Sequence, residues 1–150
     1  GDTEKLAFPE YARRLGLDLD KAGASIIEVG GKRNLIEFCR IARSFNIPFG
    51  VVYDEDSLDI KSKKEEGNYN AELDDFGVDG NRSWRFTKTY EDELKTAVGG
   101  DAEYQRLCQK YSNTGKPTRA RLIAADPTTA VPKKVNDILT WLSGNKESAQ

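Results

Sequence analysis

Several residue types that often carry chemistry are missing or scarce in this sequence. It has no histidine, no methionine and two cysteines, Cys39 and Cys108, among 150 residues. Without histidine, histidine-dependent serine or cysteine hydrolase triads and histidine-ligated zinc sites are excluded. The cysteines lack the paired spacing of a zinc site, so we expect buried thiols. Acid–base chemistry must therefore use carboxylates, lysine, tyrosine or metal-bound water.

Long apolar runs are missing as well. No run reaches the length of about 18 residues that a transmembrane helix needs, so a membrane span is excluded. Residues 1–5 lack the basic and apolar regions of a secretory signal, which predicts a cytoplasmic protein. The absence of an initiating methionine indicates a piece of a longer chain. With 37% hydrophobic residues, the sequence can still bury one substantial core.

The net charge of −2 is distributed unevenly along the chain. Residues 1–100 hold 15 Lys and Arg against 20 Asp and Glu, a net charge of −5, whereas residues 101–150 hold 8 against 5, a net charge of +3. The acidic part suits cations and the basic part suits an anion. A nucleic acid partner is allowed by this asymmetry but is not required by it.

The pattern of apolar residues predicts helices alternating with short strands. Residues 57–82 are polar and rich in turn formers, so we expect a loop with at most one helical turn near 71–76. The alternation suits right-handed crossovers and predicts an α/β fold with a mostly parallel sheet. The expected helices are 4–15, 34–45, 90–98, 102–112, 117–125 and 132–142; the expected strands are 25–29, 47–53 and 84–86.

The strand expected at 47–53 ends in three consecutive acids, Asp54, Glu55 and Asp56. In an extended chain Asp54 and Asp56 leave the same face, so their carboxylates can converge on one cation. Ligands of parallel α/β sheets bind beyond the carboxyl ends of the strands. The pattern therefore predicts a divalent-metal site. A solvated turn or the cap of the next helix is the alternative, and the residues alone leave it open.

Taken together, five motifs resemble a Toprim domain, most closely the Toprim nuclease half of the overcoming-lysogenization-defect (OLD) family. The resemblance covers about residues 1–125 and is most specific in the first 60. The motifs are Gly1-Asp2-Thr3-Glu4, Gly30-Gly31-Lys32, Asp54-Glu55-Asp56-Ser57, Tyr90-Glu91-Asp92-Glu93-Leu94 and Gly115-Lys116-Pro117. Gly30-Gly31-Lys32 lacks the spacing of a phosphate loop, so we expect no ATP to bind here.

The resemblance implies a metal-dependent DNA endonuclease that uses two Mg²⁺ or Mn²⁺ ions per site. Two hard cations roughly 4 Å apart polarise the scissile phosphate and steady the leaving oxygen. Each residue also has a structural alternative, such as a helix cap or a surface charge. The implied catalytic residues are Glu4, Asp54, Asp56 and Lys116; the metal ligands are Glu4, Asp54, Asp56, Ser57 and Glu91; the nucleic-acid-binding residues are Arg106, Lys110, Arg119 and Arg121.

The chain also departs from the family pattern. The family's first strand, and the glutamate expected immediately before Gly1, are absent from the sequence, as is the ATPase half that precedes the Toprim half in OLD proteins. We therefore expect a Toprim-like domain at 1–125 that lacks its first strand, followed by a helix and tail at 126–150. The expected partners are DNA and that ATPase half, with a homodimer left open and no membrane.

Two other functions compete with the nuclease. A haloacid-dehalogenase-like phosphatase also has a strand that ends in Asp-x-Asp, where the first aspartate is a covalent nucleophile. Here Leu58 stands where that family has threonine or valine, and the strand is not the first. The third hypothesis is a non-catalytic Toprim-like module for dimerisation or nucleic acid binding, which the missing glutamate favours.

Overall fold

The computed structural model describes residues 1–55 and 63–144, with no side-chain detail for residues 63–67. It divides into two compact units. We call Gly1–Glu28 with Glu91–Gln150 the helical unit and Val29–Tyr90 the sheet unit. Each unit has its own buried core.

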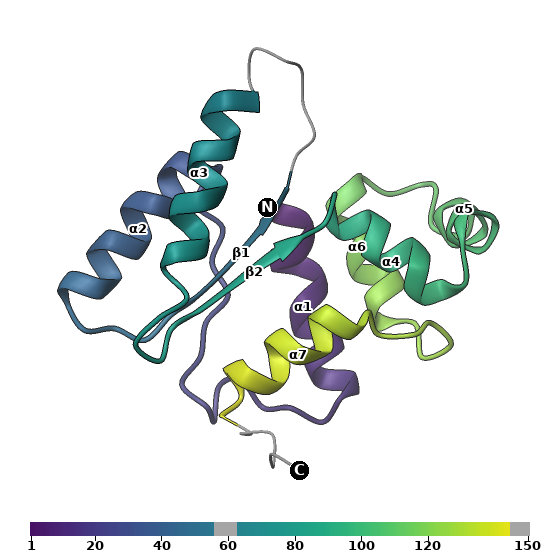
Figure 1. Ribbon diagram of the computed structural model, residues 1–150. Coiled ribbons are helices and arrows are strands. Elements are labelled where there is room, and N and C mark those ends of the chain that lie inside the picture. Colours follow the sequence, from purple (N-terminus) through teal and green to yellow (C-terminus); the bar gives the residue numbers. More distant parts are fainter. Residues whose placement is uncertain (56–62, 145–150) are drawn as a thin grey trace, which may run out of the picture. The chain divides into compact units, whose positions relative to one another are not determined.

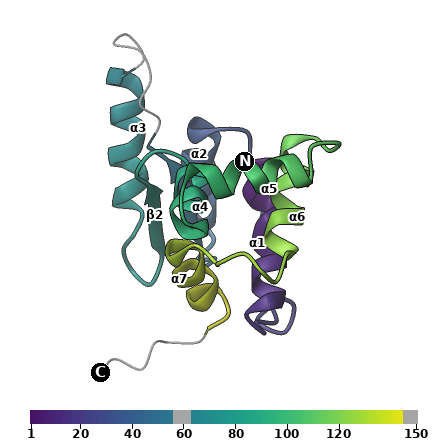
Figure 2. The ribbon, with the colours of Figure 1, turned by 90° about the vertical axis from the view of Figure 1, so that its right-hand side faces the viewer.

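The helical unit is built around α1, which packs against α6 and α7, while α5 packs against α6 (Figure 2). Acidic residues in the first turn of α1 and basic residues in its last turn complement the helix dipole. Apolar side chains from all of these helices fill the core, including Tyr11, Leu94, Leu107, Ile123 and Leu139. The helices are α1 (Asp2–Arg14), α4 (Tyr90–Val98), α5 (Asp101–Lys110), α6 (Lys116–Ala125) and α7 (Lys133–Leu142).

The sheet unit contains α2 (Lys32–Ser44), β1 (Gly50–Asp54), α3 (Lys63–Asp75) and β2 (Arg82–Phe86). The two strands pair in parallel, from Gly50 opposite Arg82 to Asp54 opposite Phe86. Side chains alternate between the faces of a strand. Val51 and Tyr53 share one face and pack with residues of α2 and α3, so both helices cover that face of the sheet (Figure 1).

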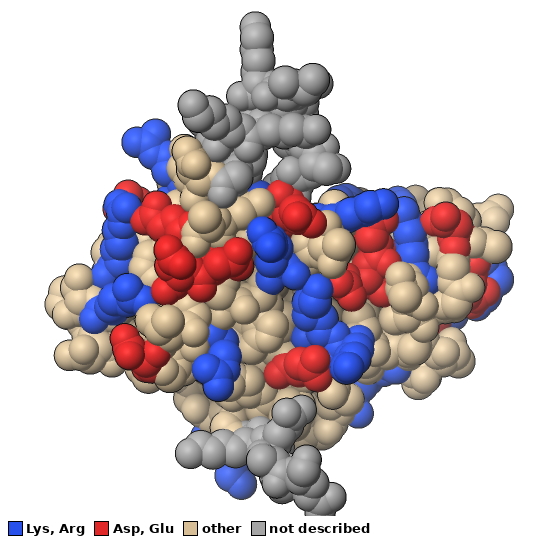
Figure 3. All heavy atoms as spheres, viewed as in Figure 1, with Lys and Arg blue, Asp and Glu red and all other residues tan. Residues whose placement is uncertain are grey.

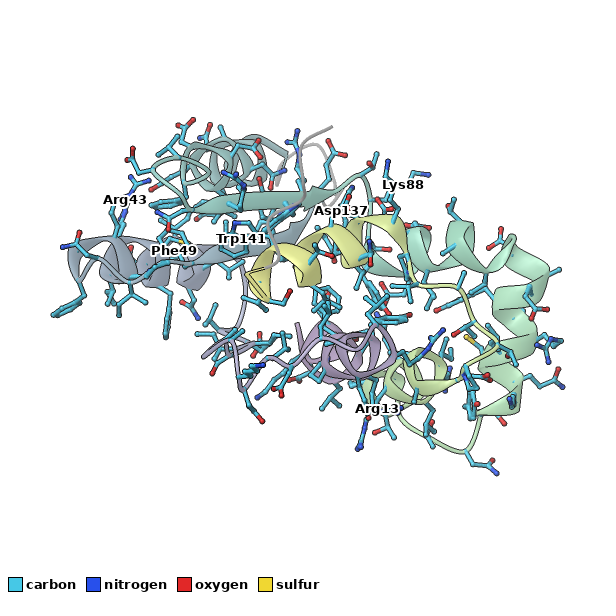
Figure 4. All side chains as sticks on the ribbon, turned by 90° about the horizontal axis from the view of Figure 1, so that it is seen from below. Arg13, Arg43, Phe49, Lys88, Asp137 and Trp141 are labelled. Atoms are coloured by element: carbon cyan, nitrogen blue, oxygen red, sulfur yellow. The ribbon has the colours of Figure 1, made fainter. Side chains whose placement is uncertain are left out.

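Phe76, just after α3, closes one end of this core. The Phe49 ring meets it edge to face at 6.0 Å between centroids, and the Arg43 guanidinium lies 4.8 Å from the Phe76 centroid. Arg43 and Phe49 are labelled in Figure 4. The cation on the ring adds to the apolar packing, because the face of an aromatic ring attracts positive charge.

Two expectations about secondary structure were wrong. Residues 25–29 form no strand, because a strand needs a hydrogen-bonded neighbour and β1 and β2 pair only with each other within the described residues. The loop expected at 57–82 contains α3 and the start of β2. Tyr69, Leu73 and Phe76 line the buried side of this segment at helical spacing, a signal that the surrounding polar residues obscured.

The predicted fold class is confirmed as mixed α/β, with a small parallel sheet of two strands flanked by helices. The six expected helices are present with shifts of one or two residues at most of their ends. The domain boundary expected at residue 125 stays a prediction. Over the described residues, no helix is both long and apolar enough to cross a membrane.

Candidate functional site

Asp54 is the last residue of β1, at the carboxyl end of the sheet. It lies on the face opposite α2 and α3, because Val51 and Tyr53 occupy the face that those helices cover. Its Oδ1 accepts a hydrogen bond from the Tyr90 backbone N–H at 3.0 Å. Tyr90 is the last residue of the sheet unit, so this bond joins the end of β1 to the end of that unit.

The backbone next to Asp54 is held from both helices of the sheet unit. Lys32 Nζ donates to the Glu55 carbonyl at 3.3 Å, and Asn70 Nδ2 donates to the same oxygen at 3.0 Å. Lys32 is placed by the turn before α2, where Gly30 and Gly31 have φ of 77° and 100°. Both angles lie in the left-handed region, which favours glycine.

Tyr53, on the other side of Asp54, has the same two helices as neighbours. Its hydroxyl proton is shared between two acceptors, the Asn70 backbone carbonyl at 3.1 Å and Asp74 Oδ1 at 2.5 Å, and the Lys32 ammonium lies 5.9 Å from its ring centroid. Burial, with the hydrogen bond to Asp74, raises the pKa of the Tyr53 hydroxyl above its ordinary value. The hydroxyl therefore stays protonated and remains a donor at neutral pH.

Asn70 is a residue that the sequence argument missed. Asn70 is 6% exposed, and its buried Oδ1 has no hydrogen-bond partner within the part of the chain that the structure describes. An unpaired buried acceptor is unfavourable and is uncommon in folded proteins. A cue was present in the sequence, because Asn70 neighbours Tyr69 on the buried side of the Tyr69–Leu73–Phe76 pattern.

The donors at this strand end suit a hard cation in type but do not complete a site. Carboxylate oxygens are what Mg²⁺ and Mn²⁺ prefer, and Asp54 supplies one carboxylate. Within the described ranges, no three Asp, Glu, Cys or His residues are grouped closely enough to hold a metal. The predicted ligands Asp56 and Ser57 lie outside the described residues.

The remaining predicted acids, Glu4 and Glu91, belong to the helical unit, whereas Asp54 belongs to the sheet unit. Glu4, in the first turn of α1, pairs with the Gly1 amine at 2.7 Å. Glu91, in the first turn of α4, pairs with Lys116 at 2.6 Å, which brings together two of the predicted site residues. The Glu91 side chain is 19% exposed and that of Lys116 is 70% exposed.

The four predicted nucleic-acid-binding residues all have partners inside the helical unit. Arg106 pairs with Glu103 at 2.6 Å, Lys110 with Asp126 at 2.7 Å, and Arg121 with Glu10 at 2.9 Å. Arg119 Nη2 donates to the Thr114 carbonyl at 3.0 Å. On the face that Figure 3 shows, basic and acidic side chains are interleaved rather than gathered by sign.

The fold and the strand-end acid together define a small mixed α/β module with an acidic residue at the carboxyl end of its parallel strands. Residues 1–56 match the family model for the TOPRIM domain of overcoming-lysogenization-defect-like proteins, which confirms the resemblance over that segment. The match indicates a nucleic-acid-processing, metal-binding type of module. Comparisons with curated proteins and with solved structures found no match.

Proposed function

We propose that this chain is the Toprim part of a metal-dependent DNA endonuclease that cleaves phosphodiester bonds with two Mg²⁺ or Mn²⁺ ions. The observation that carries the proposal is the family match over residues 1–56, which includes Glu4, Asp54 and Asp56. The place of Asp54 at the carboxyl end of β1 supports it, because parallel α/β sheets bind ligands there.

In this proposal the residues divide the work by charge. Asp54, Asp56, Glu4, Ser57 and Glu91 hold the cations. A divalent cation bound by such ligands stabilises the negative charge that develops on a phosphate during cleavage. Lys116 adds a positive charge beside the phosphate, as a lysine or arginine does in other phosphoryl-transfer sites. The proposed contacts to the DNA backbone come from Arg106, Lys110, Arg119 and Arg121.

The Glu91–Lys116 ion pair joins a proposed metal ligand to the proposed phosphate-binding lysine. The pair holds the Lys116 ammonium beside the start of α4, and the ammonium neutralises the charge of the Glu91 carboxylate. A cation that recruits Glu91 would compete with Lys116 for the same carboxylate. Lys116 would then be available to a phosphate, so metal binding and phosphate binding would favour each other.

Nicking of supercoiled plasmid in Mg²⁺ or Mn²⁺ tests the proposal. Asp54→Asn removes the charge but keeps an oxygen that accepts the Tyr90 N–H, so folding is preserved. We expect nicking to fall by about 100-fold or more, the scale seen when one group that stabilises transition-state charge is lost. Asp75→Asn, at an exposed position at the end of α3, is the matched control and leaves nicking unchanged.

Two results would direct the assignment elsewhere. A phosphoaspartate trapped on Asp54 would identify a phosphatase of the haloacid dehalogenase type, because only that chemistry uses the first aspartate as a nucleophile. The second result is a plasmid that stays intact with several metals, both for this chain and for a version extended upstream through a strand that ends in glutamate. This outcome would favour the non-catalytic module for DNA binding or dimerisation.

A further inference from the structure

We infer that Lys32 and Asn70 are positioning residues for Asp54, acting through the backbone that follows it. This inference rests on the proposed function, because it concerns how the acid is presented to a cation. Neither residue supplies a ligand in the predicted site.

Lys32 and Asn70 both contact residues that adjoin Asp54. Lys32 reaches the Glu55 carbonyl with its ammonium and lies over the Tyr53 ring. The Asn70 side-chain amide donates to the Glu55 carbonyl, while the backbone carbonyl of the same residue, on α3, accepts from the Tyr53 hydroxyl. The residues before and after Asp54 are therefore each held by α2 and by α3.

Pairing with β2 accounts for only part of what holds residues 54 and 55 in place. Beyond the last pair of the ladder, Asp54 with Phe86, the backbone bond from Glu55 N–H to the Phe86 carbonyl at 3.0 Å holds the strand end on the β2 side. The Glu55 carbonyl instead receives the two side-chain donors. Together these contacts hold the peptide groups on both sides of Glu55, and thus the direction in which Asp54 leaves the strand.

The chemistry of Asn70 argues against a role in packing alone. Asn70 is 6% exposed, and among the described residues its Oδ1 has no hydrogen-bond partner. An apolar side chain of similar size would fill the space without leaving a buried acceptor unpaired. What such a side chain could not do is donate to the Glu55 carbonyl.

Lys32 adds charge to the same arrangement. It is half-buried and bonded to a backbone oxygen within a run of three acids, Asp54 to Asp56. A cation there lowers the repulsion among neighbouring carboxylates. Catalytic groups must be held within a fraction of an ångström of their working geometry, and residues that hold them are as necessary as the ligands.

Amide hydrogen exchange, followed by NMR on the whole chain without metal, tests the positioning. The reporters are the Glu55 N–H, bonded to Phe86, and the Tyr90 N–H, bonded to Asp54. We expect Lys32→Met and Asn70→Ala to speed exchange at both reporters by about tenfold. The Arg82 N–H, bonded to the Phe49 carbonyl at the other end of the sheet, is the internal reference.

Matched variants separate positioning from general damage. Arg33→Met removes an exposed cation next to Lys32, and Asn68→Ala truncates an exposed amide two residues before Asn70. Both should leave the reporters unchanged, and Lys32→Arg should restore them, because it keeps a charged donor. If Asn70→Ala speeds exchange at Arg82 as much as at the two reporters, the variant loosens the sheet unit as a whole. Lys32→Met, which leaves the core intact, then decides whether Asp54 is positioned by these contacts.

Titration with Mn²⁺ alone, by calorimetry, links the geometry to the site. We expect Lys32→Met and Asn70→Ala each to weaken Mn²⁺ binding by about tenfold, at the lower end of the range for groups that orient metal ligands. If the unaltered chain binds Mn²⁺ but the variants bind it equally well, the inference is wrong and the proposed function stands. If the unaltered chain does not bind Mn²⁺, both are wrong.

One further outcome overturns the inference in a specific way. If Lys32→Met leaves Mn²⁺ binding intact but weakens DNA binding and lowers its salt slope by about 1, then Lys32 contacts a phosphate directly. Lys32 would then belong to the DNA-binding residues rather than to those that position Asp54.

Discussion

The helical unit and the sheet unit use their charged side chains differently. In the helical unit most of the predicted functional cations are paired with carboxylates of the same unit, as Lys116 is with Glu91 and Arg121 with Glu10. In the sheet unit, polar side chains are directed at backbone groups beside Asp54. In the helical unit the paired charges can change partner when a ligand binds. In the sheet unit the side-chain donors hold the backbone in place.

The largest expected effects come from the separate cores. Leu139→Ala in the helical unit and Leu73→Ala in the sheet unit should each lower the free energy of unfolding by about 3 kcal/mol, because both side chains are fully buried. Hydrogen exchange should show each loss mainly within its own unit. Equal loss of protection in both units for either variant would mean that the two cores unfold together. The units would then differ in their residues but not in their stability.

Asp126 is expected to give a smaller, pH-dependent effect in the helical unit. Lys110, first, and then Thr128 hold the pKa of the Asp126 carboxyl well below its ordinary value through hydrogen bonds. A carboxyl with a lowered pKa stabilises the fold above the pKa of the unfolded chain, about 3.9, and that stabilisation is lost as the pH falls towards the folded value. Asp126→Asn should cost about 2 kcal/mol at pH 7.

Chemical denaturation of Asp126→Asn and of the unaltered chain between pH 7 and pH 3 measures this effect. The two stabilities should converge as the pH falls below about 4, where protonation of the unfolded aspartate begins. Asp137→Asn, on α7, is a control for the loss of one negative charge. A difference that stays constant with pH would show that Asp126 acts through its shape rather than through its charge.

Variants of Glu91 and Lys116 test whether their ion pair competes with metal binding. Glu91→Gln should weaken Mn²⁺ binding by about tenfold if Glu91 is a ligand, whereas Lys116→Met should leave it unchanged or strengthen it by freeing the carboxylate. Calorimetry with Mn²⁺ gives both values. Equal affinity for Glu91→Gln and the unaltered chain would restrict Glu91 to its ion pair with Lys116.

The smallest expected effects belong to the exposed ion pairs of the helical unit. Arg106→Ala and Arg121→Ala should each leave stability nearly unchanged, because exposed ion pairs contribute little. In DNA binding each should lower the salt slope by about 1 if it contacts a phosphate. Unchanged DNA affinity in both variants, with Arg13→Ala as the control, would mark these residues as surface pairs alone.

Much of this architecture was predictable because it depends on local patterns. The expected helix at 90–98 matches α4 at both ends, and the strand expected near 84–86 lies within β2. Periodic apolar residues and glycine stops act over a few residues, so they can be recognised without the fold. The acid-ended strand was recognised for the same reason, although the structure includes Asp54 within β1 rather than beyond it.

The misses share a different physical origin. Residues 25–29 have strand-like composition, but a strand also requires a neighbour that composition does not supply. α3 was missed because polar residues outnumber the few apolar ones that pack into the core. Asn70 was missed with it, since its relevance comes from the Glu55 carbonyl, 15 residues earlier in the chain.

The sequence by itself determined the chemistry that this protein has at its disposal: oxygen ligands, lysine and arginine, without histidine. It also determined where a strand would end in acids, because apolar and acidic residues adjoin there. Tertiary structure alone decided which cations are paired with carboxylates and which side chains hold the backbone beside Asp54. Such pairings depend on distances between residues far apart in the chain, and only folding sets those distances.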